Sequence, residues 1–382
     1  MLPINPVLLQ YMSSIFQMDQ RRPNGIVQIV HPLHDQPGDY GIYQIDRLQS
    51  VDIARTYDSP AAEFEFVADD TWGWLSPDYG PNKFPDLRID RGDPAGNPWI
   101  GVLRPNTRVI IHLGYGDQLV RQLTGLIDVV TINALEKTIT VRGRSMYKRL
   151  LVETPPEPLK WENKRPDEIL TDIHNQLSMS IEAEQVSIFG TNDPYIIPLL
   201  EIARGITYHM GIQDVIDTVY GYIKTRANGV TIFKKKRIAT AQEEADYVLD
   251  EAINLTEMEY GITDYNIFNA LTVTCGEDKN SYEDQGLRAF CRNGFREEII
   301  DIPWATTEAK RSMAAMALFR FNRQKIRSLT IGAVGNPAVE LYDLCRIREH
   351  VSTATQNYLV KEIRTSYNKD GYFDIMSMEM AM

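Results

Sequence analysis

Hydrophobic and polar positions alternate with a period of two through much of residues 103–151, which predicts an all-β segment. The first strand covers residues 107–115, and one of its faces carries Val109, Ile111, Leu113 and Tyr115. A Gly-Asp turn at 116–117 leads into a long second strand, and a third strand covers residues 138–144. Such a meander predicts a half-buried antiparallel sheet, whose usual closed form is a small barrel.

A second β run near the C-terminus repeats this order of elements. It consists of strands at 341–349, 357–367 and 372–379, with an Asp-Gly turn before the last of them. The lengths and spacing match those of the first run, although few residues are identical. Antiparallel meanders are common, so coincidence is one explanation. A true repeat would give two similar barrels flanking a helical insert.

The N-terminal residues 1–24 contain an apolar stripe at helical spacing. A helix at a chain end must bury such a stripe on its own body or on another chain, and the sequence leaves both open. We expect this stripe to be a docking surface made of Leu8, Tyr11, Ile15 and Phe16.

Residues 71–100 break the β pattern with many Gly, Pro and Asp residues. A loop of this length in a compact domain is usually functional or disordered, and its tryptophans argue against plain disorder. We expect a loop that contacts a neighbouring subunit, with a lid over the same domain as the alternative. The candidate contact residues are Trp72, Trp74 and Trp99.

The middle of the chain mixes helix and strand signals. Helices are predicted near 166–177 and 211–219, and Asn228-Gly229 between apolar runs predicts a hairpin. The expected fold class is therefore α+β and β-dominated. The expected domains are an N-terminal arm at 1–24, a first β-barrel domain at 25–154 with the 71–100 loop, a small α+β insert at 155–250, and a second β-barrel domain at 251–382 with a helix at 306–324.

Composition narrows the possible functions. The 382 residues are 43% hydrophobic and 24% charged, as expected of a folded protein of two or three domains. The formal net charge of −12 argues against a surface built to hold nucleic acid. Three widely spaced cysteines indicate reduced, buried thiols, and no apolar run has the roughly 20 residues of a membrane span. Folding in a cytoplasm-like compartment is expected.

Candidate chemistry is sparse. His31 and His34 are a weak metal signal, and the adjacent carboxylates Asp69-Asp70 and Glu243-Glu244 point to opposite faces if they lie on strands. The basic run at 234–237 is expected to be a solvated strand edge. No nucleophile, metal or phosphate-binding motif is present. We therefore predict no catalytic, cofactor-binding or metal-binding residues and no cofactor.

Three passages share their pattern with one family. Residues 48–69 contain an Asp-Ser-Pro-Ala-Ala turn that feeds a Glu-Phe-Glu-Phe strand, residues 103–151 contain Gly-Leu-Ile-Asp and Val-Arg-Gly-Arg-Ser, and residues 328–372 contain Gly-Asn-Pro and Tyr-Leu-Val-Lys-Glu-Ile. In these passages the chain resembles the bacteriophage tail hub or baseplate hub proteins, which are related to the barrel-bearing half of type VI secretion spikes. It departs from them at Tyr342-Asp343, where relatives often have Gly-Asp, and in its long loop between Trp72 and Trp99.

The resemblance implies a structural virion protein rather than an enzyme. It implies a homotrimer whose two barrels per chain mimic sixfold symmetry, joining the tail tube to threefold components of the tail tip or baseplate. The implied partners are the tail tube protein, a distal tail ring protein, a tail fibre, spike or tip protein, and the tape measure protein. DNA would pass through the lumen without specific binding, because three chains would carry three times the net charge of −12. The alternative function is a tail-associated enzyme that degrades the cell wall, a peptidoglycan hydrolase or peptidase.

Overall fold

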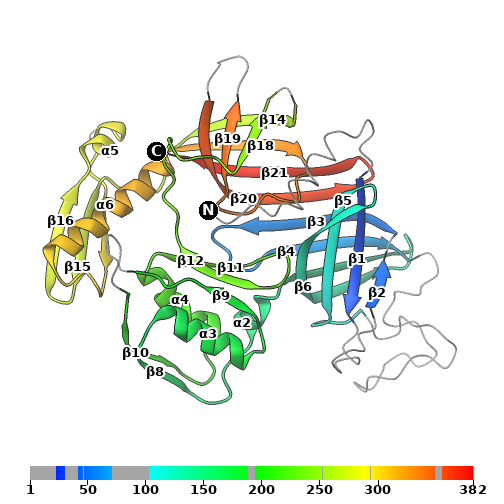
Figure 1. The fold of residues 1–382 in the computed structure, drawn as a ribbon, viewed down its shortest axis with the longest axis horizontal. Coiled ribbons are helices and arrows are strands. Elements are labelled where there is room, and N and C mark those ends of the chain that lie inside the picture. The colour runs from blue at the N-terminus through cyan, green and yellow to red at the C-terminus, as the bar shows by residue number, and fades with distance from the viewer. Residues whose placement is uncertain are drawn as a thin grey trace.

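The computed structural model describes residues 23–30, 42–45, 47–70, 103–187, 194–251, 253–292, 294–348 and 355–381. These residues form an α+β fold dominated by strands, as the sequence predicts. The largest element is a 13-stranded sheet that contains strands from both ends of the chain (Figure 1). In the part of the chain described, none of the helices combines the length and the apolar character needed to cross a membrane.

Five strands of this sheet form what we call the N-terminal unit. Their order in the sheet is β3-β4-β7-β6-β5, and all neighbours are antiparallel. Two further strands, β1 (Pro23–Val30) and β2 (Ile42–Ile45), extend the sheet beyond β5. The five strands are β3 (Leu48–Thr56), β4 (Glu63–Asp69), β5 (Arg108–Tyr115), β6 (Gln118–Asn133) and β7 (Thr138–Ser145).

Five other strands form what we call the C-terminal unit, in the order β14-β18-β21-β20-β19. A short strand, β13 (Tyr247–Asp250), pairs in parallel with β19. The five strands are β14 (Leu255–Ile262), β18 (Arg327–Val334), β19 (Leu344–Arg348), β20 (Thr355–Asn368) and β21 (Gly371–Met380).

Residues 148–235 form an α+β block below the sheet in Figure 1. Its helices begin where the sequence supplies caps: the Arg165 N–H donates to Glu168 at the start of α3, and Thr207 caps α4 by accepting from the Met210 N–H. The Asn228-Gly229 hairpin joins β11 and β12, as predicted. The elements are α2 (Lys148–Val152), β8 (Leu159–Lys164), α3 (Pro166–Gln176), β9 (Ile181–Ala183), β10 (Ile197–Ile202), α4 (Tyr208–Thr218), β11 (Gly221–Thr225) and β12 (Thr231–Lys235).

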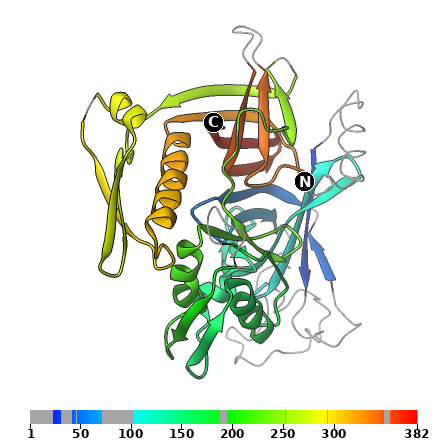
Figure 2. The same ribbon diagram turned by 60° about the vertical axis from the view of Figure 1, so that its left-hand side comes forward.

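A second insertion separates β14 from β18, although these two strands pair in the sheet. It forms a lobe that Figure 2 shows beside the sheet, with the helix predicted at 306–324 present as α6 (Glu308–Gln324). Thr307 caps this helix by accepting from the Lys310 N–H. The other elements of the lobe are β15 (Ala270–Cys275), β16 (Asp278–Glu283), α5 (Gln285–Phe290) and β17 (Glu297–Asp301).

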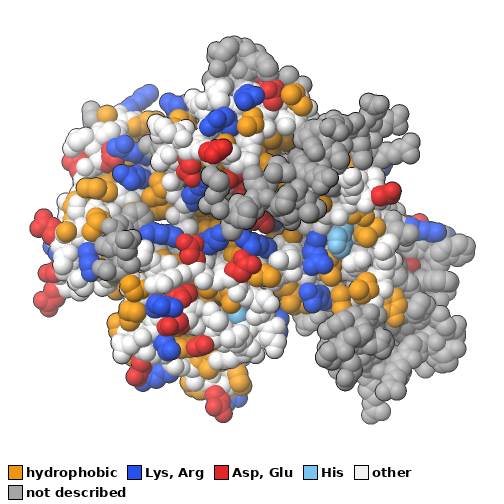
Figure 3. All heavy atoms as spheres, viewed as in Figure 1, with side chains coloured by type: hydrophobic (Ala, Val, Ile, Leu, Met, Phe, Trp, Pro, Cys, Tyr) orange, Lys and Arg blue, Asp and Glu red, His pale blue; other side chains and the backbone are white. Residues whose placement is uncertain are grey.

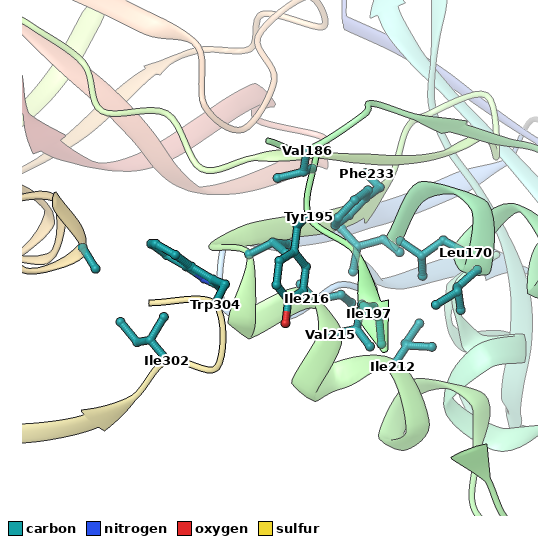
Figure 4. Packing of buried hydrophobic residues seen from close by; sticks show 14 of the residues in the cluster. Leu170, Val186, Tyr195, Ile197, Ile212, Val215, Ile216, Phe233, Ile302 and Trp304 are labelled. Atoms are coloured by element: carbon teal, nitrogen blue, oxygen red, sulfur yellow. The ribbon is translucent and has the colours of Figure 1, made fainter. Parts of the chain in front are cut away.

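The described residues bury three hydrophobic clusters. One fills the N-terminal unit, a second fills the C-terminal unit, and the largest joins the α+β block to the lobe. In this largest cluster, Ile302 and Trp304 of the lobe lie on the side of Tyr195 and Ile216 (Figure 4), and the Trp304 indole donates to the Thr218 carbonyl at 2.8 Å. No pairing among the described strands closes either unit on itself, so closure into two barrels stays a prediction.

Candidate functional site

The two units of the sheet are structural repeats, and two of their irregularities coincide, whereas a shift at Gln122 between β5 and β6 has no counterpart between β19 and β20. In the N-terminal unit, the ladder between β6 and β7 shifts at Asp128; in the C-terminal unit, the ladder between β20 and β21 shifts at Lys361. A second shift lies at Gln49 between β3 and β4, and its counterpart lies at Thr256 between β14 and β18. Bulges are specific features of a strand, so their recurrence at equivalent points supports a true repeat over coincidence.

The approach to the two equivalent strands β5 and β19 also matches. Asn106 and Tyr342 both have left-handed backbones, with φ of 68° and 70°. The Asn106 N–H donates to the Ile127 carbonyl at 2.7 Å, and the Tyr342 N–H donates to the Val360 carbonyl at 2.9 Å. A tyrosine is strained in this conformation and glycine is not, so the departure from the resemblance at Tyr342-Asp343 falls at a position whose backbone favours glycine.

The repeats meet inside the chain where β20 pairs with β3. The long strand β20 uses one edge twice: its first residues pair with β19, and residues 362–368 pair antiparallel with residues 56–50 of β3. We call this pairing the internal junction. Behind it, Thr365 accepts from Arg55 at 2.9 Å and donates to the buried carboxylate of Asp374 at 2.7 Å. The junction therefore joins the two units through backbone ladders and buried side-chain hydrogen bonds.

An aromatic cluster lies beside the internal junction. The ring of Tyr342 stacks on Tyr222 with centroids 4.2 Å apart and meets Tyr57 edge-on at 5.2 Å. The bulge residue Lys361 places its ammonium 4.1 Å from the Tyr57 ring centroid and 3.1 Å from Glu379. Cation–π contacts and ring packing thus hold both units and the α+β block together at one point.

The corresponding bulge residue in the N-terminal unit, Asp128, has the opposite charge and contacts two basic side chains. Its carboxylate accepts from Arg144 at 2.8 and 3.1 Å and lies 2.8 Å from the buried ammonium of Lys148. Burial alone would raise the pKa of Asp128, but hydrogen bonds from Arg144 and Lys148 outweigh it and lower this pKa below its ordinary value.

Replacing Asp128 with alanine is expected to lower the free energy of unfolding by about 2 kcal/mol, because Lys148 would stay buried without its carboxylate. Since the folded pKa is depressed, the contribution of Asp128 is present above the unfolded pKa and is lost as the pH falls through the folded one. Urea unfolding at neutral and acidic pH measures both effects. Asp117→Asn, at the exposed β5–β6 turn, is the control; an Asp128→Ala variant as stable as this control would contradict the assignment.

The α+β block contacts the C-terminal unit through a buried charged group. Lys224 donates to the Leu341 carbonyl at 3.0 Å and lies 3.8 Å from Glu340. Asp343 accepts from the Glu340 N–H at 2.6 Å, and burial raises the pKa of Asp343 to about 7. Burial also lowers the pKa of Lys224. Two groups with shifted pKa values, Lys224 and Asp343, therefore lie where the α+β block meets the C-terminal unit.

The residues singled out from the sequence fall into two groups. Trp72, Trp74, Trp99, Leu8, Tyr11, Ile15, Phe16, His31 and His34 lie outside the described residues. The basic run at 234–237 is described, and it is half-buried rather than solvated: Lys236 lies 5.1 Å from the Tyr57 ring centroid, and Arg237 pairs with Asp246 at 3.1 Å. It begins on β12, which is the central strand of its small sheet and not an edge.

Candidate metal ligands do not cluster in the part of the chain that the structure describes. No group of three His, Cys, Asp or Glu side chains is placed there to hold a metal ion. Glu243 accepts from Arg237, so this carboxylate has a structural partner. Side chains of both charges lie next to one another over much of the face in Figure 3.

Sequence reasoning missed the charged bulges and the tyrosine cluster. The bulges leave a trace in the sequence, because the polar pair Lys361-Glu362 interrupts the alternation of β20 and Asp128 interrupts that of β6. The meeting of Tyr57, Tyr222 and Tyr342 depends on tertiary structure and leaves no such trace.

No protein-family model matches the sequence, and no curated protein matches it. Similarity appears in solved structures. A 43 kDa tail protein of prophage MuSo2 from Shewanella oneidensis aligns with a TM-score of 0.62 at 14% identity, covering 93% of this chain and 98% of that one. A tail protein from Neisseria meningitidis MC58 aligns with a TM-score of 0.63 at 13% identity, covering 94% and 96%.

A complex from Francisella also contains a similar fold. A chain of the Francisella PdpA-VgrG complex aligns with a TM-score of 0.53 at 9% identity, covering 99% of this chain and 61% of that one. The sheet of two repeated units, the blocks inserted into it and these alignments all agree with the resemblance found in the sequence. The chain therefore has the fold of the bacteriophage tail proteins.

Proposed function

We propose that this protein is a structural component of a phage tail, a hub at the tail tip or baseplate that assembles as a homotrimer in the virion. The observation that carries the proposal is the repeat: one chain presents two equivalent five-strand units in one sheet. Three chains in a closed ring would present six such units, because closed cyclic symmetry is the common state of homo-oligomers. A threefold assembly could then match a sixfold tube.

The proposed partners follow from this symmetry. The six repeated units would contact the tail tube protein or a distal tail ring protein. The opposite side would accept threefold tail fibre, spike or tip components, and the bore would admit the tape measure protein and DNA. The net charge of −12 per chain supports a bore that does not grip phosphates. Assembly in the host cytoplasm is proposed as well.

The similarity of fold to tail proteins supports a role without catalysis, because those proteins are named as tail components. An enzyme that degrades the cell wall is the competing function. Zymography on peptidoglycan separates the two: the purified chain is expected to leave the gel opaque, and a cleared band would overturn the structural role.

Mass photometry of the purified full-length chain tests the assembly. We expect a main species with the mass of three chains, because the proposed ring has six units and each chain supplies two of them. Negative-stain images of that species are expected to show a ring with six similar densities. A hexamer, or a monomer at micromolar concentration, would contradict the proposed hub.

A further inference from the structure

Two strand edges of the main sheet have no partner among the described strands, and they correspond to the two edges that meet in the internal junction. β20 corresponds to β6 and β3 corresponds to β14, because each pair occupies the same place in the repeated units. β20 pairs with β3 inside the chain. The same edge of β6, beyond the residues that pair with β5, and the outer edge of β14 are both unpaired in the described part of the chain. Unpaired edges of this kind are templates for strand addition.

We propose that β6 of one copy pairs with β14 of the next copy, in an antiparallel ladder that reproduces the internal junction between chains. The inference rests on the proposed trimer and deepens it by naming the surface that makes it. The contact is heterologous, since each copy offers β6 on one side and β14 on the other. Such contacts generate closed rings when the rotation between copies closes.

The bulges set the register of this ladder. Lys361 corresponds to Asp128, and Gln49 corresponds to Thr256. In the internal junction, residue 362 lies opposite residue 56 and residue 368 lies opposite residue 50. Transferred to the other two strands, this register places residue 129 opposite 263 and residue 133, the last of β6, opposite 259. Ile132 then lies opposite Tyr260, and Val130 lies opposite Ile262.

The side chains on these edges fit that register. On the face that continues the two hydrophobic clusters, the ladder brings together Val130, Ile132, Met258, Tyr260 and Ile262. Three of them are conspicuously exposed in the single chain: Ile132 at 37%, Tyr260 at 49% and Ile262 at 72%. Ile139, opposite Ile132, and Leu329, opposite Tyr260, are fully buried, whereas Arg327, opposite Ile262 at the strand end, is exposed. Pairing of two copies would extend the core of one N-terminal unit into the C-terminal unit of its neighbour.

The opposite face of the ladder is more polar. It would carry Thr131, Asn133, Glu259 and Thr263, together with the exposed Val129. The internal junction has the same asymmetry: Ile53 and Ile363 are buried on its inner face, and Asp52 and Arg364 are exposed on its outer face. A sheet with one apolar and one polar face is the arrangement expected when one side covers a core and the other meets water.

Cross-linking tests the register directly. Residues directly opposite in an antiparallel pair have Cα atoms roughly 4.5 to 5.5 Å apart, within the range that a disulfide spans. We therefore expect the full-length double variant Ile132→Cys/Tyr260→Cys, or Thr131→Cys/Gly261→Cys on the adjacent pair, to form linked dimers and trimers under mild oxidation. The single-cysteine variants control for linkage through the native thiols. Denaturing gels without reductant read the result.

A charged side chain placed in the proposed ladder tests the same contact, because it is expected to weaken the trimer. Ile132→Lys is expected to lower the trimer fraction by about tenfold or more, because an ammonium would be buried in the ladder without a partner. The matched control is Ile299→Lys, which changes an isoleucine that is 68% exposed on the edge strand β17 of the lobe. Circular dichroism of both variants is expected to match that of the unmodified chain, since neither side chain is buried in the single copy.

The outcomes distinguish the ladder from the hub. A trimer that survives Ile132→Lys and yields no cross-link in either pair would overturn the ladder and leave the hub proposal standing. A monomer that yields no cross-link would overturn both. Cross-linked species that continue beyond three chains would keep the ladder and overturn the closed threefold ring.

Discussion

Replacing Gly143 with alanine is expected to lower the free energy of unfolding by about 3 kcal/mol or more. A Cβ atom at Gly143 would lie 2.3 Å from the Leu126 carbonyl oxygen and 2.6 Å from the ring of Phe64. The carbonyl belongs to the neighbouring strand β6, and Phe64 is buried in the cluster of the N-terminal unit. Neither the Leu126 carbonyl nor the Phe64 ring can move aside without a shift of the sheet. Urea unfolding at a fixed protein concentration, followed by circular dichroism, measures the loss.

Gly116→Ala is the matched control for this variant. Gly116 lies in the β5–β6 turn of the same unit with φ of +58°, and an added Cβ would meet nothing within 4 Å. Its substitution is expected to cost only roughly 1 kcal/mol, from the left-handed backbone alone. Equal losses for the two variants would show that the close approach at Gly143 is tolerated and would contradict the packing described here.

Removing the charge of Asp343 is expected to flatten the dependence of stability on pH. The folded pKa of Asp343 is raised to about 7 by burial, above that of an unfolded aspartate. Between these two values the folded chain holds a proton that the unfolded chain has released. Stability therefore falls as the pH rises, by up to about 1.4 kcal/mol for each pH unit. Asp343→Asn keeps an oxygen that can accept from the Glu340 N–H and removes this titration.

Urea midpoints measured from pH 5 to pH 8 test this effect, with the slope rather than the absolute stability as the readout. Asp343 interacts electrostatically with the charged side chains of Lys224, Glu340 and Asp246, and the variant leaves all three unchanged. Asp117→Asn removes one carboxylate from an exposed turn and is expected to retain the slope of the unmodified chain. If Asp343→Asn has that same slope, the carboxyl does not titrate in this window.

The local parts of the fold could be predicted from the sequence. Alternation identified the β5-β6-β7 and β19-β20-β21 meanders, Asn228-Gly229 identified a hairpin, and Thr307 begins a helix close to the predicted start. Each of these signals lies within a few residues of the structure that it specifies. The order and spacing of the strands also suggested the repeat, with coincidence left open as the alternative.

The tertiary contacts could not be predicted in the same way. β3 and β20 pair across most of the chain, and no local pattern specifies which edge meets which. Trp304 and Tyr195 belong to one hydrophobic cluster, although they fall in different predicted domains, 251–382 and 155–250. The exposed apolar residues Tyr260 and Ile262 look like ordinary strand residues until the structure shows that their edge is unpaired.

The internal junction also determines how the chain is exposed while it is being made. Arg55 and Thr365, which meet there, are separated by 310 positions, so β3 leaves the ribosome long before its partner exists. Contacts between strands so distant in sequence form late. Until they form, the unpaired strand edges can pair with other nascent chains. The edge of β3 that faces β20 therefore stays open for nearly the whole of synthesis, and chains that stop before β20 are expected to present it permanently and to aggregate.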